Sequence, residues 1–137
     1  MENQEINLFI VDDDKLLATS LKYYLQNKFG DELRITIFND GDSCLEKIDR
    51  LTHIVILDYF LGGKNGLVIL KSIKAVNPKT EVIMLSGNED MAIAIETFRS
   101  GAKDYVAKGV GSWEKITDLL NSIIIKPIRI VVKGFFG

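Results

Sequence analysis

The chain has few of the residues that build cross-linked or metal-stabilised frameworks. Its 137 residues include one cysteine (Cys44), one histidine (His53) and two prolines. A single cysteine cannot form an intramolecular disulfide, and one cysteine with one histidine cannot supply the four ligands of a structural zinc site. The fold must therefore be stabilised by a hydrophobic core, for which the apolar content of 47% is ample.

Basic excess and long apolar runs are also missing. Lysine and arginine total 17 against 19 acidic residues, a formal net charge of -2, so composition gives no case for nucleic acid or an anionic membrane surface. No apolar run approaches the roughly 18 residues of a membrane span. Residues 2–5 are polar or acidic, unlike a signal peptide. We expect a cytoplasmic domain without direct nucleic-acid binding.

Five short apolar segments alternate with segments of helical spacing, in a chain long enough for one domain. The apolar, β-branched segments predict strands over residues 6–11, 33–38, 54–57, 82–85 and 105–107. Strands separated by helices cannot pair as tight hairpins. The pattern therefore predicts an α/β fold with a parallel sheet and helices on both faces.

The last twelve residues differ from this repeating pattern. Pro127 is expected to end the fifth helix, which leaves an apolar segment over residues 126–137. We therefore divide the chain into a domain over residues 1–125 and a short extension over 126–137. The extension is either a tail on a stand-alone domain or the start of a linker or truncated output region.

Polar residues follow four of the five predicted strands. They are Asp12-Asp13-Asp14, Asp58, Ser86 and Lys108. In an open parallel sheet the carboxyl ends of the strands meet at one edge, where ligands bind. Each residue has a local alternative, since Asp13 or Asp14 can cap a helix, serine suits turns and lysine is commonly solvated. None of these alternatives explains why the residues converge.

The convergence has a chemical interpretation. Neighbouring carboxylates repel one another unless a cation lies among them, and hard oxygen ligands favour Mg²⁺ or Mn²⁺ over zinc. With a lysine and a hydroxyl beside them, such a set can position and neutralise a phosphoryl group. Asp58 would then act as the nucleophile and form an acyl phosphate.

Four motifs in this order resemble the receiver (phosphoacceptor) domain of two-component response regulators. They lie at residues 11–14, at 57–58 with 66–67, at 85–87 and at 101–108, and the resemblance covers about residues 6–125. The resemblance implies a bacterial signalling protein with the flavodoxin-like doubly wound fold. That fold has a five-stranded parallel sheet in the order 2-1-3-4-5 and five helices.

The resemblance also implies roles for the acidic residues. Asp58 is expected to take a phosphoryl group from a sensor histidine kinase or a phosphotransfer protein. Asp12 and Asp13, together with Asp58, are expected to hold Mg²⁺, and Phe60 to supply a backbone carbonyl to the metal. Such a protein is a phosphoacceptor with intrinsic phosphotransfer and autodephosphorylation chemistry rather than an enzyme.

The remaining implied roles concern phosphoryl binding and signal output. Ser86 and Lys108 are expected to bind phosphoryl oxygens, and Tyr105 to switch rotamer as Ser86 shifts. The face made by helix four, strand five and helix five would then contact a second copy or an output partner. The chain departs from the family at Gly109, where a proline after a cis bond is usual. A non-proline cis bond costs about 3 kcal/mol, so we expect a trans bond there.

Three other classes of protein share some of these features. The segment 62–66 has the glycines and lysine of a P-loop, but Asn65 follows Lys64 where serine or threonine is required. A haloacid-dehalogenase-type phosphatase would need an aspartate where Phe60 stands. The remaining alternative is a degenerate receiver that binds proteins without being phosphorylated, although this chain keeps every residue that such proteins lose.

Overall fold

The computed structural model describes residues 5–87 and 90–136, with side chains as far as Ile124. The N-terminal residues 1–4, and the side chains of the apolar extension over 126–137, lie outside this described part. The elements run in chain order as follows: β1 (Ile6–Val11), α1 (Lys15–Phe29), the 3-10 turn η1 (Gly30–Glu32), β2 (Leu33–Phe38), α2 (Gly41–Lys47), β3 (Ile54–Asp58), β4 (Phe60–Leu61), β5 (Lys64–Asn65), α3 (Gly66–Val76), β6 (Glu81–Ser86), α4 (Met91–Arg99), β7 (Asp104–Ala107) and α5 (Ser112–Phe136).

Five strands form one parallel sheet in the order β2-β1-β3-β6-β7. Counted without the short hairpin, this is the predicted order 2-1-3-4-5, so the fold prediction is confirmed. The two-residue strands β4 and β5 pair antiparallel as a separate hairpin after Asp58. Periodicity could not predict this hairpin because two-residue strands are too short to alternate.

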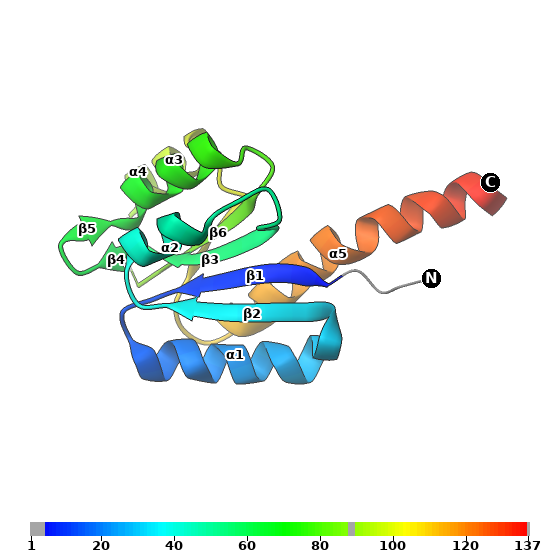
Figure 1. Ribbon diagram of the computed structural model, residues 1–137, viewed down its shortest axis with the longest axis horizontal. Helices are drawn as coiled ribbons and strands as arrows, with labels where there is room; N and C mark the ends of the chain where they lie inside the picture. The colour runs from blue at the N-terminus through cyan, green and yellow to red at the C-terminus, as the bar shows by residue number, and fades with distance from the viewer. Residues whose placement is uncertain (1–4, 88–89, 137) are drawn as a thin grey trace.

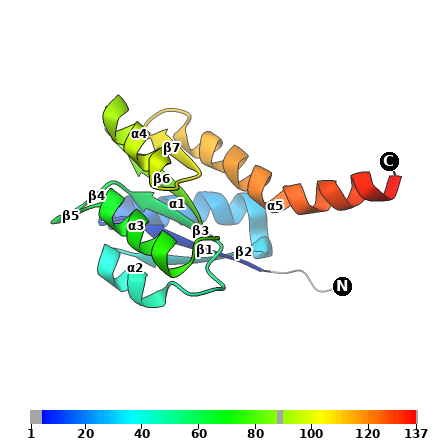
Figure 2. The same ribbon diagram turned by 90° about the horizontal axis from the view of Figure 1, so that it is seen from above.

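Helices cover both faces of the sheet (Figures 1 and 2). Helices α1 and α5 lie on one face, and α2, α3 and α4 lie on the other. Each face has its own cluster of buried apolar side chains. Every residue of β3 is buried, as expected for a central strand with helices on both sides. The sheet therefore holds Asp58, the last residue of β3, on a rigid support.

Two aspartates cap helices in the structure. The Asp14 carboxylate caps α1 by accepting a hydrogen bond from the Leu17 backbone N–H at 3.0 Å. Asp40 caps α2 by accepting one from the Ser43 backbone N–H at 2.7 Å. Capping satisfies backbone donors that a helix start leaves unpaired. Asp14 therefore serves the helix, while Asp12 and Asp13 stay available to the strand-end cluster.

The expected helix end at Pro127 is wrong, because α5 continues to Phe136. The helix extends beyond the body of the domain and changes direction along its length (Figure 2). A proline removes one backbone donor and crowds the preceding turn. A helix that contains a proline can therefore bend and continue instead of ending.

Gly66 opens α3 at a point where the backbone passes close to the end of β3. A Cβ at this position would lie 2.6 Å from the Asp58 carbonyl oxygen and 2.8 Å from the Tyr59 Cα. Backbone atoms cannot move aside as a flexible side chain can. We therefore expect Gly66→Ala to lower the free energy of unfolding by about 2 kcal/mol in urea denaturation. Gly63→Ala is the matched control because a Cβ there meets nothing within 4 Å. Equal stability of the two variants would contradict this account.

Candidate phosphoacceptor and metal site

Three carboxylates meet at the carboxyl ends of β1 and β3. One oxygen from each of Asp12, Asp13 and Asp58 lies within 4.8 Å of the others. Asp12 and Asp58 are buried, whereas Asp13 is exposed. The parallel pairing of β1 with β3 brings together residues that are 46 positions apart in the chain.

The position of Asp12 is determined by its hydrogen bonds to neighbouring segments. Its backbone N–H donates to the Phe38 carbonyl at 3.0 Å, and its own carbonyl accepts from the Asn39 side-chain amide at 3.1 Å. Its Oδ1 accepts from the Asp14 backbone N–H at 2.9 Å. Its Oδ2 is buried and has no hydrogen-bond partner among the described residues. One carboxylate oxygen is therefore oriented but unsatisfied.

Lys108 supplies the positive charge closest to the two buried carboxylates. Its Nζ lies 3.2 Å from Asp58 Oδ1 and 3.7 Å from Asp12 Oδ2. The lysine follows β7, and its backbone N–H donates to the Ser86 carbonyl at 2.8 Å. Ser86 ends β6 and is fully buried. The structure thus brings Asp12, Asp13, Asp58 and Lys108 together, with Ser86 on the strand between β3 and β7.

The pKa of Asp58 is raised from 3.8 to about 6. Burial is the main cause, because the side chain is only 4% exposed. The negative charge of Asp12 raises the pKa further, and Lys108 offsets part of the increase. A single lysine therefore does not balance the carboxylates around it.

The excess of negative charge at this cluster bears on whether a metal ion fits the site. Three carboxylates face one lysine, and an oriented, buried oxygen of Asp12 lacks a hydrogen-bond partner among the described residues. Buried charges in proteins are normally paired or coordinate metals. All the available ligands are oxygens, which suits a hard divalent cation. The residues present therefore fit a divalent metal ion.

The loop after Lys108 has the expected peptide geometry. The described residues include no cis peptide bond, so the Lys108–Gly109 bond is trans. Gly109 and Gly111 have φ values of 137° and 85°, which side chains with a Cβ rarely adopt. Glycine thus allows a backbone path that places Lys108 at the site without the proline usual in the family.

Phe60 and Tyr105 have different environments in the structure. The Phe60 backbone N–H donates to Asp58 Oδ1 at 3.4 Å, while its side chain is 55% exposed. Tyr105 is half-buried on β7 and packs against the core cluster on the α2–α3 face. It pairs with Met84, two residues before Ser86 on the adjacent strand. A metal-ligating carbonyl at Phe60 and a switching ring at Tyr105 stay predictions.

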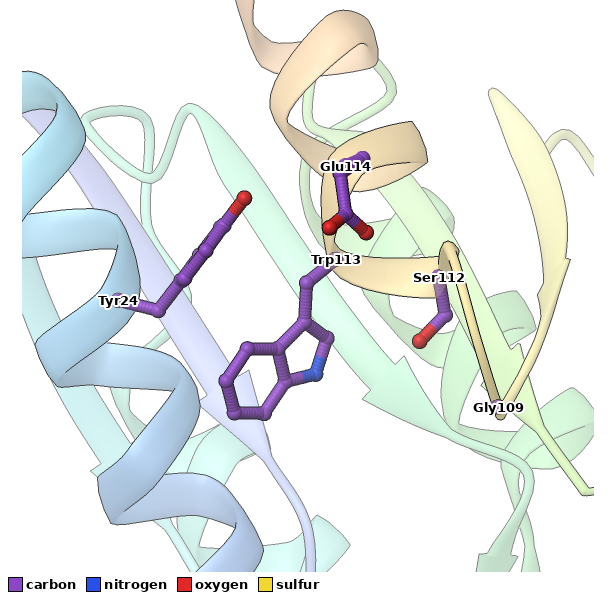
Figure 3. Close-up of a pocket in the computed structure, with 5 residues that line it drawn as sticks. All are labelled: Tyr24, Gly109, Ser112, Trp113 and Glu114. Carbon is purple, nitrogen blue, oxygen red and sulfur yellow. The ribbon is translucent and has the colours of Figure 1, made fainter.

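Trp113 has a structural partner in α1. Its ring lies 5.1 Å from the Tyr24 ring between centroids, and it packs partly buried at the edge of the core on the α1–α5 face. Figure 3 shows the two rings side by side, with Gly109 and Ser112 on the other side of the indole. A core-edge position therefore accounts for this tryptophan without a partner protein.

His53 and Cys44 lie away from the acidic cluster. His53 precedes β3 at the opposite end of that strand from Asp58, and its Nδ1 accepts a hydrogen bond from the Asn7 backbone N–H at 3.0 Å. Cys44 is fully buried, and burial raises its thiol pKa to about 12. Neither residue presents a reactive group to the site.

Sequence comparisons identify the family of this fold and site. The model of the response regulator receiver domain matches residues 8–121. The chain therefore belongs to the receiver domains of two-component response regulators, a family of signalling domains. No helix among the described residues has the length and apolarity that crossing a membrane would need.

Similar proteins include transcriptional regulators from bacteria. MalR of Bacillus subtilis is 33% identical over 104 residues, which cover 75% of this chain and 44% of MalR. ZraR of Klebsiella oxytoca is 30% identical over 109 residues, which cover 79% of this chain and 24% of ZraR. The chain thus spans less than half the length of these two relatives.

Solved structures show the same fold. The BeF3-activated receiver domain of DrrB is 28% identical, with a TM-score of 0.77 over 88% of this chain and 98% of that one. The response regulator DrrB of Thermotoga maritima is 27% identical, with a TM-score of 0.78 over 90% of this chain and 54% of that one.

Proposed function

We propose that Asp58 accepts a phosphoryl group from the phosphohistidine of a sensor histidine kinase or phosphotransfer protein, in a reaction that requires Mg²⁺ or Mn²⁺. The observation that carries this proposal is the buried Asp58 carboxylate with Lys108 Nζ 3.2 Å away. Asp12 and Asp13 lie beside Asp58, and the three carboxylates carry more negative charge than Lys108 alone can neutralise. Membership of the receiver family supports the same chemistry.

The transfer step is a displacement at phosphorus. A carboxylate oxygen of Asp58 forms a bond to the phosphorus atom while the P–N bond of the donor breaks. The leaving imidazole takes the electron pair of that bond and acquires a proton. The product is an aspartyl acyl phosphate. Asp58 must be deprotonated to attack, so a pKa of about 6 leaves most molecules reactive at pH 7.

The other side chains have positioning and electrostatic roles. Asp12, Asp13 and Asp58, with the Phe60 carbonyl, would hold the metal, which when bound neutralises charge on the phosphoryl oxygens. The Lys108 ammonium binds one phosphoryl oxygen, and the Ser86 hydroxyl binds another. Lys108 is already in contact with Asp58 before transfer, so little reorganisation is needed when charge develops there.

We further propose how the signal leaves the site. Engagement of the Ser86 hydroxyl shifts a pre-existing equilibrium, and Tyr105 changes its rotamer in response. The face of α4, β7 and α5 then contacts a second copy or an output partner in the cytoplasm. Residues 1–125 form this switch, and residues 126–137 form its extension. No direct contact with nucleic acid is assigned to this chain.

Acetyl phosphate tests the proposal because it donates a phosphoryl group without a protein partner. With Mg²⁺, intact-protein mass spectrometry should show the addition of one phosphoryl group, sensitive to hydroxylamine as an acyl phosphate is. With excess EDTA, we expect labelling to fall at least about a hundredfold, since the carboxylates then repel the anionic donor. No labelling under any metal condition would favour the degenerate receiver, which binds without phosphorylation. Equal labelling with and without EDTA would contradict the metal assignment.

A further inference from the structure

The loop that presents Lys108 has few contacts of its own. Only Gly109, Val110 and Gly111 separate this lysine from Ser112, the first residue of α5. Val110 is fully exposed, and a Cβ at either glycine would meet nothing within 4 Å. Glycine also leaves the backbone more conformational freedom than any other residue. The path of this loop must therefore be set by the segments at its two ends.

The two ends of the loop are tied to different elements. At the first end, the Lys108 backbone N–H donates to the Ser86 carbonyl of β6 at 2.8 Å. At the second end, the Gly109 carbonyl accepts from the backbone N–H of Ser112 at 3.1 Å, and Ser112 is buried. The buried strand β6 supports the first end rigidly. The second end is only as fixed as the first turn of α5.

Trp113 packs this first turn of α5 against α1. It is the second residue of α5 and the only tryptophan in the chain. Its ring is tilted by 50° from the plane of the Tyr24 ring, and both residues pack against the core cluster of the α1–α5 face. Figure 3 shows the indole between Tyr24 and the segment that holds Gly109 and Ser112. Aromatic side chains bury a large area in a defined geometry, so this contact can fix the start of the helix.

The surroundings of Trp113 give its side chain a defined structural weight. A cavity of about 310 Å³ already lies beside the indole. Truncation of the indole would enlarge this cavity and remove the ring contact with Tyr24. The first turn of α5 would then be free to shift, and the glycine loop would transmit the shift to Lys108.

We propose that Trp113 is a positioning residue for phosphoryl transfer and that it acts through Lys108. Its packing on Tyr24 fixes the first turn of α5, and the loop then holds the Lys108 ammonium 3.2 Å from Asp58 Oδ1. Trp113 is not part of the acidic cluster and takes no part in the chemistry itself. This inference rests on the proposed function, because Lys108 can assist transfer only if Asp58 is the phosphoacceptor.

The experiment measures labelling by acetyl phosphate in saturating Mg²⁺, at a temperature at which circular dichroism shows every variant to be folded. Trp113→Ala removes the ring contact, and we expect the labelling rate to fall about tenfold, because a small displacement of a group at the reacting atoms has effects of at least this order. Trp113→Phe keeps an aromatic ring beside Tyr24 and should stay within about twofold of the wild type. Leu119→Ala is the matched control, because Leu119 packs partly buried against the same core cluster further along α5. It should leave the rate unchanged.

The Lys108→Met background shows whether Trp113 acts through the lysine. Without the ammonium the loop has no group to position, so adding Trp113→Ala to Lys108→Met should slow labelling further by less than about twofold. A purely structural role would instead give the same fold-loss in both backgrounds, because the effects of independent residues multiply.

The possible outcomes distinguish this inference from the proposed function. A wild-type rate in Trp113→Ala would overturn the inference, as would an equal loss in Leu119→Ala or the same fold-loss in both lysine backgrounds. A loss in Trp113→Phe as large as that in Trp113→Ala would show that the ring contact does not place the lysine. If the wild type were not labelled at all, the proposed function itself would fail, and this inference with it.

Discussion

Asp58→Asn is expected to abolish labelling by acetyl phosphate while making the metal-free protein more stable at pH 8. An amide oxygen is a far weaker nucleophile than a carboxylate, and it cannot form the acyl phosphate without losing its nitrogen. The substitution keeps the shape of the side chain on β3. It also removes a buried negative charge that lies beside Asp12 and is only partly balanced by Lys108.

The stability effect has a defined dependence on pH. The folded-state pKa of Asp58 is about 6 against 3.8 for the ordinary group. Between these values the folded protein holds a proton that the unfolded chain has released, so stability falls as pH rises through this range. The full penalty is present above pH 6 and is at most about 3 kcal/mol. This penalty already includes the attraction of Lys108 for the carboxylate. Because an amide is an imperfect substitute for the protonated carboxyl group, we expect Asp58→Asn to recover about 1–2 kcal/mol of it.

Denaturant unfolding in EDTA at several pH values measures this gain. The difference in unfolding free energy between Asp58→Asn and the wild type should grow from pH 4 to pH 7 and then level off. Added Mg²⁺ should stabilise the wild type more than the variant, because one carboxylate ligand is missing from the variant. A difference that stays constant with pH would show that the Asp58 carboxylate is not destabilising. Labelling of the variant would show that another residue accepts the phosphoryl group.

Lys108→Met is expected to slow phosphoryl transfer to Asp58 by about a hundredfold to a thousandfold. The substitution keeps an apolar stem of similar length but removes the ammonium that lies 3.2 Å from Asp58. Loss of one preorganised donor at a site where charge develops has effects of this size in other active sites. The rate of labelling by acetyl phosphate in saturating Mg²⁺ measures the loss.

The same substitution should change the stability of the metal-free protein. Without Lys108, both Asp12 and Asp58 lose the cation that lies near them, and the pKa of Asp58 should rise further. We expect a loss of about 1–3 kcal/mol at pH 8 in EDTA, since Lys108 is partly exposed and water screens part of the interaction. Mg²⁺ should restore part of this stability by replacing the missing positive charge.

An exposed lysine provides the control for this experiment. Lys71 lies on the solvent side of α3, away from the acidic cluster. Lys71→Met removes one positive charge, as Lys108→Met does. It should alter neither the labelling rate nor the response to Mg²⁺. If both lysine variants behaved alike, the effect would arise from overall charge, and Lys108 would have no special role at Asp58.

Several features of the fold were predictable because their causes are local. Apolar runs indicated the five strands of the main sheet, and the intervening helical segments required parallel pairing. The sequence indicated Asp13 or Asp14 as the cap of the first helix, because a short acidic side chain just before a helix can reach its free N–H groups. The strand-end rule then indicated that Asp12, Asp58, Ser86 and Lys108 belong to one edge.

Other features depend on contacts between distant segments. The β4–β5 hairpin has strands too short for any periodic signal, and its pairing exists only in the folded chain. The need for glycine at position 66 comes from the Asp58 carbonyl passing 2.6 Å from where a Cβ would lie. Pro127 shows the opposite case: its local tendency to end a helix did not prevail in α5.

The order of the strands in the sheet was an expectation from the resemblance to receiver domains, whereas the sequence by itself determined the class of fold and the identity of the acidic residues at one edge. Periodicity and residue type carry this information, because each depends on a few neighbouring residues. Only the tertiary structure decided the charge balance of the site. Asp12 Oδ2 has no hydrogen-bond partner in the described part of the chain, and Lys108 contacts Asp58; both features depend on side chains at the ends of three strands. The raised pKa of Asp58 follows from burial among those strands, so no single segment of the sequence is enough to predict it.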